Sequence, residues 1–178
     1  MRVSRVVMST AAAIALAAVP AVSAHAQKVS PSVDFGVRAG LAVPFSDLSN
    51  AVNSGFTVGG TAQITAPAWP VAVRGAVDFT SYGAKVGSGS LRDLGFTVDA
   101  LLPLSPMGPA PYLVGGIGIH HLSSSNGGNS ENDFGFGIGA GYKWSLSSMT
   151  AYLEAKYQYV SATGSSWNSL PITFGLTF

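Results

Sequence analysis

Apolar side chains alternate with small or polar ones along most of the chain after residue 32. The pattern is clearest in residues 170–178, where proline, threonine and glycine separate five apolar residues: Leu170, Ile172, Phe174, Leu176 and Phe178. Because successive side chains of a strand point to opposite faces, a period of two predicts a β-strand with one apolar face. Residues 170–178 are therefore expected to form a strand whose other face is small or polar.

The same alternation predicts seven earlier strands, separated by segments rich in proline, glycine, serine or asparagine. Their expected ranges are 33–43, 56–64, 71–80, 94–102, 112–121, 134–144 and 149–160. A capped turn or short helix is expected within 45–53. The pair Gly115-Gly116 is compatible with a bulge, so the pattern leaves open which side chains of the fifth strand face outward.

The connections between these strands alternate in expected length. Those at 65–70, 103–109 and 145–148 are short, whereas those at 45–55, 81–93, 122–133 and 161–169 are longer. Short periplasmic turns and longer outward loops are typical of outer-membrane barrels. Both mature termini are therefore expected in the periplasm.

The first 26 residues have the features of a cleaved secretory signal peptide. Arg2 and Arg5 precede an apolar run over 6–19, and a small-residue cleavage site follows at 24–26. The run is shorter than the ~20 residues that a spanning helix needs. A retained anchoring helix is the alternative, which the cleavage site disfavours. We therefore expect residues 27–178 to form the mature chain as a single domain.

Composition narrows the class of protein to a membrane barrel. Hydrophobic residues make up 47% of the chain and charged residues 10%, the latter well below the ~25% of soluble domains. No later segment is apolar for the ~18 residues of a spanning helix, and a bilayer admits only helices and closed barrels. The sequence therefore predicts an all-β, eight-stranded antiparallel up-and-down transmembrane β-barrel, expected to be a monomer. A soluble lipocalin-like barrel is the alternative, but its charges would face outward.

Eight charged residues fall on the inward faces of the expected strands: Asp34, Arg38, Arg74, Asp78, Asp99, Lys143, Glu154 and Lys156. An eight-stranded barrel is just wide enough for side chains to fill it, so these four acids and four bases must pair or be hydrated. We expect a network of salt bridges that plugs the lumen, and a narrow channel for small solutes or ions is the alternative. Four glycines of the sixth strand are expected to leave room for long side chains from across the lumen: Gly135, Gly137, Gly139 and Gly141.

Charge and cysteine content exclude several other functions. Removal of Arg2 and Arg5 changes the formal net charge from +1 to −1, so no nucleic-acid partner is expected. The absence of cysteine excludes disulfide scaffolds and thiol catalysis. No phosphate-binding loop or zinc motif is present, so neither a cofactor nor a metal is expected.

Four segments carry a resemblance to a known family: 35–40 (FGVRAG), 111–118 (PYLVGGIG), 152–157 (YLEAKY) and 175–178 (GLTF). The mature chain resembles, over residues 33–178, the small eight-stranded bacterial outer-membrane β-barrels that include OmpX, OmpW and the membrane domain of OmpA. The resemblance implies a place in the cell outer membrane, surrounded by outer-membrane lipid and lipopolysaccharide. It also implies a structural or cell-surface interaction role, with loops that contact surface ligands, or else transport of small solutes.

The final strand resembles the C-terminal assembly signal of such barrels. By that resemblance, Phe174, Leu176 and Phe178 would be recognised by the barrel-assembly machinery.

The residues His120-His121-Leu122-Ser123 faintly resemble the site of a lipid A deacylase. By that resemblance, His121 would be the base and Ser123 the nucleophile of a hydrolase. Asn126 departs from the family pattern, because it lies three residues from Ser123 instead of beside it. Adjacent histidines on a strand point to opposite faces, so they are also poorly placed to bind one metal. We expect no enzymatic activity and assign both histidines to interfacial polarity.

Overall fold

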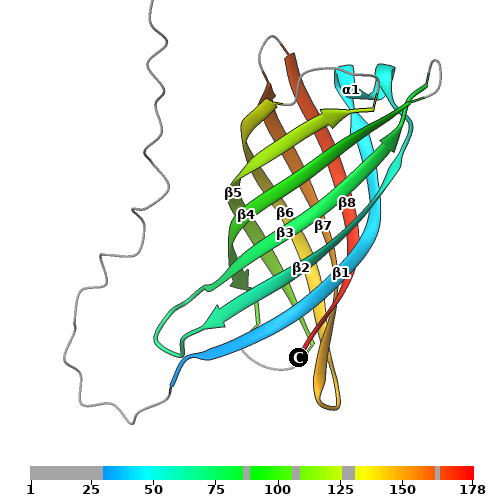
Figure 1. The fold of residues 1–178 in the computed structure, drawn as a ribbon. Helices are drawn as coiled ribbons and strands as arrows, with labels where there is room; N and C mark the ends of the chain where they lie inside the picture. The colour runs from blue at the N-terminus through cyan, green and yellow to red at the C-terminus, as the bar shows by residue number, and fades with distance from the viewer. Residues whose placement is uncertain (1–29, 86–88, 106–108, 126–130, 163–164) are drawn as a thin grey trace, which may run out of the picture.

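The computed structural model describes residues 30–85, 89–105, 109–125, 131–162 and 165–178. In these residues eight antiparallel strands follow one another in sequence order and close into a barrel (Figure 1). The elements are β1 (Ser32–Phe45), α1 (Ser46–Ala51), β2 (Gly55–Thr65), β3 (Ala72–Gly83), β4 (Ser90–Pro103), β5 (Ala110–Ser124), β6 (Glu131–Leu146), β7 (Met149–Ala162) and β8 (Ser165–Thr177). The predicted all-β eight-stranded barrel is confirmed. The expected signal peptide, residues 1–26, lies outside the described residues.

The first and last strands close the barrel. Arg38 of β1 is paired with Gly175 of β8, and the backbone N–H groups of Phe35 and Phe178 each donate to the other's carbonyl oxygen at 3.0 and 2.8 Å. Such pairing leaves neither β1 nor β8 with an open edge, which a bilayer would not tolerate. The strand expected over 170–178 is therefore confirmed and closes the barrel against β1, although β8 begins five residues earlier.

The strands are longer than predicted, with 11 residues in β2 and 16 in β6. The longer loops expected at 45–55, 81–93, 122–133 and 161–169 shrink to connections over 46–54, 84–89, 125–130 and 163–164. The turns at the opposite end occupy 66–71, 104–109 and 147–148, so the expected contrast in loop length holds for 46–54 and was wrong for the other three connections. Serine, asparagine and glycine can continue a hydrogen-bonded ladder beyond the bilayer, and they mark exposure to water instead of the end of a strand.

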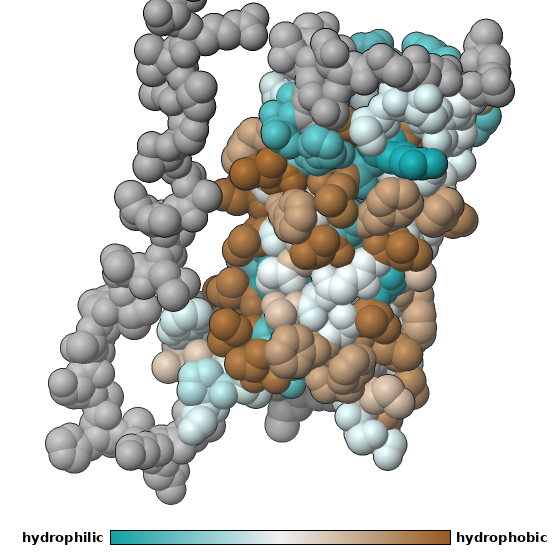
Figure 2. All heavy atoms as spheres, viewed as in Figure 1, coloured by the Kyte–Doolittle hydropathy of each residue, from teal (hydrophilic) through white to brown (hydrophobic). Residues whose placement is uncertain are grey.

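The outward faces of the strands form a belt of exposed apolar side chains around the barrel. Figure 2 shows this belt across the middle of one face, with more hydrophilic residues toward the end that carries α1. Aromatic pairs lie within the belt, including Phe56 with Phe79 and Phe136 with Tyr159. The distribution matches a surface that meets lipid, because apolar area faces out instead of into a core.

The fifth strand pairs with both neighbours in continuous register through Gly115 and Gly116, so no bulge is present. Its odd-numbered residues, such as Ile117 and Ile119, are exposed on the outside, whereas Tyr112 and Val114 are buried inside. The facing that the sequence left open is thereby settled.

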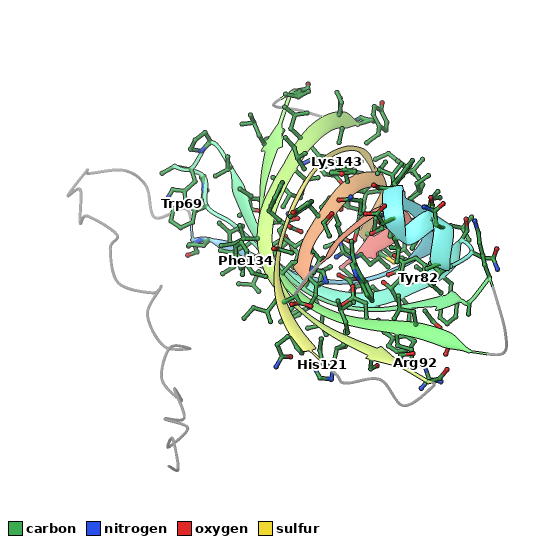
Figure 3. The ribbon with its side chains drawn as sticks, turned by 90° about the horizontal axis from the view of Figure 1, so that it is seen from above. Trp69, Tyr82, Arg92, His121, Phe134 and Lys143 are labelled. Atoms are coloured by element: carbon green, nitrogen blue, oxygen red, sulfur yellow. The ribbon has the colours of Figure 1, made fainter. Side chains whose placement is uncertain are left out.

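The short helix expected within 45–53 is present as α1 and covers one end of the lumen. Leu48 of α1 packs with Val52 and Tyr82 in a buried apolar cluster, against which Leu91 and Trp167 also lie. Figure 3, a view from above, shows α1 over one side of the mouth with Tyr82 next to it. No helix in the described part of the chain is long and apolar enough to cross a membrane.

Candidate functional site

Six of the eight predicted lumen charges meet in the middle of the barrel. They come from four strands: Arg38 on β1, Arg74 and Asp78 on β3, Asp99 on β4, and Glu154 and Lys156 on β7. Alternation along each strand turns these side chains inward. Three bases face three acids, so the cluster, which we call the lumen network, carries no formal net charge.

Arg74 and Asp99 lie at the centre of the lumen network. Arg74 Nη2 donates to Asp99 Oδ2 at 3.0 Å and to Glu154 Oε1 at 2.9 Å. Lys156 Nζ donates to the two carboxylate oxygens of Asp99 at 3.0 and 3.1 Å. Arg74 and Asp99 are only 2% and 1% exposed, so these pairs are shielded from bulk water and from salt.

Glu154 joins the two halves of the lumen network. Arg38 donates to both carboxylate oxygens of Asp78, with Nε to Oδ1 at 2.7 Å, and its Nη1 reaches Glu154 Oε1 at 3.5 Å. The hydroxyl of Tyr112 donates to Glu154 Oε2 at 2.8 Å. Glu154 on β7 therefore accepts hydrogen bonds from β1, β3 and β5, which ties strands on different sides of the barrel together.

Glycines make space for the lumen network on the neighbouring strands. A Cβ at Gly59 would lie 2.1 Å from Asp78 Oδ1, and a Cβ at Gly116 would lie 2.1 Å from Asp99 Oδ1. Each of these glycines is the cross-strand partner of the acid it accommodates. A side chain at either position would displace the carboxylate from its partners.

The glycine face of β6 makes room in the same way, with one correction to the sequence prediction. A Cβ at Gly135 would lie 2.9 Å from the ring of His120, at Gly137 3.2 Å from Lys156, and at Gly141 2.3 Å from the ring of Tyr112. A Cβ at Gly139 would instead meet the β7 backbone, 2.2 Å from a carbonyl oxygen. The side chains that use the space thus come from the adjacent strands β5 and β7, not from across the lumen. Neighbouring strands are only ~4.8 Å apart, so their side chains fill the gap first.

Asp34 and Lys143 do not join the lumen network. Both line an open cavity of about 540 Å³ at the end of the barrel that carries the C-terminus, which we call the vestibule. Among the described residues, neither forms an ion pair, and the one side-chain hydrogen bond of Asp34 is accepted by its Oδ2 from Ser32 Oγ at 3.5 Å. Arg74, Tyr112 and Tyr152 line the inner end of the vestibule.

A second polar pair, His120 and Asp93, lies above the lumen network and was missed by sequence reasoning. His120 Nδ1 is 2.9 Å from Asp93 Oδ2, and both residues line a small cavity of about 20 Å³. Such a cavity has room for about one water molecule. Asp93 was placed in a loop, yet it precedes Asp99 by three steps of two residues, so extending the alternation backward along β4 identifies it as inward.

His121 points out of the barrel, opposite to His120. Its Nδ1 is 2.8 Å from Asn132 Oδ1, and because an amide oxygen only accepts, Nδ1 is the donor of that bond. In the described residues, no hydrogen bond joins His121 to Ser123 and no carboxylate pairs with His121. Asn126 lies outside the described residues. No group of three or more potential ligands in the described part of the chain is arranged to hold a metal ion.

The proposed assembly residues lie on the outward face of β8 and just beyond its end. Phe174 and Phe178 are exposed, and Leu176 is half-buried. The ring of Phe174 lies 6.1 Å from that of Trp144 on β6. Phe174 and Phe178 thus belong to the apolar belt in the folded barrel.

The vestibule, the lumen network and the α1 cluster divide the lumen into three layers. The vestibule is open, but Tyr112 and Tyr152 pack with Leu101 and Val114 at its inner end. The guanidinium carbon of Arg74 lies 5.8 Å from the centre of the Tyr152 ring, within range of a cation–π interaction. Beyond the lumen network, Tyr82 and Leu48 pack together at the opposite mouth. Side chains therefore occupy the axis at two levels.

A family of known proteins and several solved structures share this architecture. The family described as outer membrane protein beta-barrel domain matches residues 14–178. Neisserial surface protein A superimposes with a TM-score of 0.64 at 19% identity, over 83% of this chain and 97% of that one. A major outer membrane protein of Thermus thermophilus and the outer membrane protein Ail of Yersinia pestis give TM-scores of 0.52 and 0.51, each at 16% identity over 83% of this chain and 100% of theirs. No curated protein sequence matches. At such identities the structural likeness establishes the fold alone.

Proposed function

The chain belongs to the outer membrane protein β-barrel domain family, and we propose that its lumen is closed to solutes and that it has a structural or interactive role at the cell surface. The observation that carries this proposal is the lumen network, in which three bases and three acids fill the middle of the lumen. A barrel of eight strands leaves little room beyond its own side chains. The plug is thus built into the wall of the barrel.

Passage of a solute would require the lumen network to open. If Arg74 moved aside, Asp99 and Glu154 would each lose a partner in a buried site. Breaking a buried ion pair costs about 3–5 kcal/mol when one charge is left behind. The apolar cluster of Leu48, Val52 and Tyr82 would still close the far mouth. The lumen network and this apolar cluster would act as two successive barriers, which supports a lumen that does not conduct ions or solutes.

Orientation in the membrane is part of the same proposal. We infer that the end with the chain terminus and the vestibule faces the periplasm and that the α1 end, which carries the longest connection (46–54), faces outward. The exposed polar residues of the α1 end would then meet surface ligands, and the apolar face of β8 would meet the assembly machinery during insertion. Lysine-directed labelling of intact cells would test this orientation at Lys85, which is exposed beside α1. Labelling of Lys85 only after the outer membrane is permeabilised would contradict it.

Single-channel recording tests the closed lumen. Native protein, refolded from the mature chain into a planar bilayer, should give no discrete openings. An Arg74→Ala variant removes the central base, and an Arg92→Ala variant removes an exposed base outside the lumen as its control. Folding of each sample is checked by its shift in electrophoretic mobility on heating.

The alternative function, a narrow channel for small solutes or ions, makes the opposite prediction. Discrete openings from the native barrel would overturn the closed lumen. If Arg74→Ala then changed their size or frequency and Arg92→Ala did not, the conducting path would run through the lumen network.

A further inference from the structure

The outer wall of the barrel is almost free of charge. Among the outward-facing positions of the described strands, Arg92 on β4 carries the only permanently charged side chain. The Arg92 side chain is exposed and forms no hydrogen bond or ion pair with another described residue. A guanidinium group on a lipid-facing wall reaches for the headgroup region, because burial of an unpaired charge in hydrocarbon is costly.

Arg92 lies at the edge of the apolar belt. On the outward face of β4, Arg92 directly precedes Leu94, Phe96 and Val98, which are all exposed apolar residues. Figure 3 shows Arg92 and His121 projecting outward on the same side of the barrel. The edge of the belt on this side is therefore basic and polar.

The next two strands, β5 and β6, also change from apolar to polar near Arg92. On β5, His121 and Ser123 follow Ile119, and the register places His121 opposite Leu94 and Ser123 opposite Arg92. On β6, the register places Asn132 opposite His121. Diagonal neighbours on adjacent strands are ~7–8 Å apart, within reach of an arginine side chain. Four polar groups thus form one patch at two successive register levels across three strands, and we call it the rim row: Arg92, His121, Ser123 and Asn132.

We propose that the rim row binds the phosphate group of a membrane lipid whose acyl chains lie on the apolar belt below. The fork of guanidinium N–H groups suits a phosphate oxygen pair. The bond to Asn132 uses His121 Nδ1 and leaves Nε2 for a hydroxyl of the headgroup, and the Ser123 hydroxyl is a further donor or acceptor. The identity of the leaflet rests on the proposed orientation, which makes the lipid a phosphorylated glycolipid of the outer leaflet.

The apolar surface below the rim row fits this occupant. Ile119 and Phe134 lie one step inside the row on β5 and β6, and each is more than half exposed. A free anion would use only the polar row, whereas a lipid would use the row and the belt together. The continuity between the two surfaces is the reason for choosing a lipid over a soluble phosphate compound.

Lipid titration followed by native mass spectrometry tests the proposal on the folded full-length mature barrel in zwitterionic detergent. The probes are lipid A with two phosphates, its monophosphoryl form and inorganic phosphate. Arg92→Gln should weaken the binding of diphosphorylated lipid A about fivefold, since one basic residue contributes ~1 kcal/mol at an anionic membrane surface. Arg92→Lys should lose less affinity for diphosphorylated lipid A, because it keeps the positive charge but not the two-pronged guanidinium group.

Lys85→Gln is the matched control, because it removes the same charge at the same end of the barrel, beside α1 and away from the rim row. It should bind lipid A as the native protein does. Equal lipid A binding by native protein and Arg92→Gln would overturn the proposal. If Lys85→Gln weakened lipid A binding as much as Arg92→Gln, the proposal would also fail, because the lipid would then be attracted by the charge of the whole α1 end. Displacement of lipid A by equimolar inorganic phosphate would also overturn it. These readouts do not depend on whether the lumen conducts.

Discussion

Replacing Asp99 with asparagine removes an acid that two buried cations share. Lys156 has no other ion-pair partner among the described residues, whereas Arg74 keeps Glu154. The substitution preserves the size of the side chain, so it changes charge without opening a cavity. The main effect is therefore an ammonium group left without an acid inside the barrel.

The size of the effect follows from burial. Asp99 is 1% exposed and Lys156 is 4% exposed, so water cannot replace the lost carboxylate. Leaving one partner of a buried pair uncompensated costs about 3–5 kcal/mol. The asparagine oxygen still accepts one hydrogen bond, which places the expected loss of unfolding free energy at the lower end, about 3 kcal/mol.

Reversible urea unfolding in detergent micelles, followed by tryptophan fluorescence, measures this loss. Asp34→Asn is the control, because it removes the same charge from the half-exposed wall of the vestibule and should cost under ~1 kcal/mol. Adding Lys156→Met to Asp99→Asn should restore about 2 kcal/mol, since no buried charge then stands alone. Equal unfolding free energies for Asp99→Asn and Asp34→Asn would refute the lumen network as a source of stability.

Two further substitutions, each with a control on the outward face, test the geometry around the lumen network. Gly116→Ala should destabilise the barrel by about 2 kcal/mol, because the new Cβ would lie 2.1 Å from the Asp99 carboxylate, whereas Gly115→Ala, facing outward with its nearest neighbour at 3.9 Å, should be neutral in the same urea assay. Tyr112→Phe removes a buried hydrogen bond to a carboxylate and should cost about 2 kcal/mol. Tyr142→Phe, on the exposed face of β6, should cost nothing measurable.

The period of two in the sequence was enough to predict the barrel and the facing of most strands. That success has a physical cause, since each strand borders lipid on one side and a lumen on the other, so the two faces differ in every strand. All eight predicted inward charges point away from the lipid, into the lumen network or the vestibule. The outward-facing side chains of β1 and β8 likewise follow the predicted alternation, in β8 as far as Phe178.

The ends of the strands could not be predicted in the same way. Beyond the bilayer both faces of a strand meet water or polar neighbours, so the alternation fades at residues such as Ser90 and Ser124 while the hydrogen-bonded ladder continues. The same fading hid the pair of Asp93 and His120. Which charges join the lumen network also depends on height along the barrel axis, and Asp34 and Lys143 lie too near the open end to take part.

The neutrality of the lumen network bears on what the lumen can attract. A pore that draws ions inward presents a ring of one charge or a line of carbonyl oxygens to the solute. Here each carboxylate of the network is bonded to a neighbouring cation, and the three bases and three acids cancel. The middle of the barrel thus offers little field to an incoming ion. Arg92, in contrast, has no partner among the described residues and projects outward, so contact with another molecule is expected at the rim instead of along the axis.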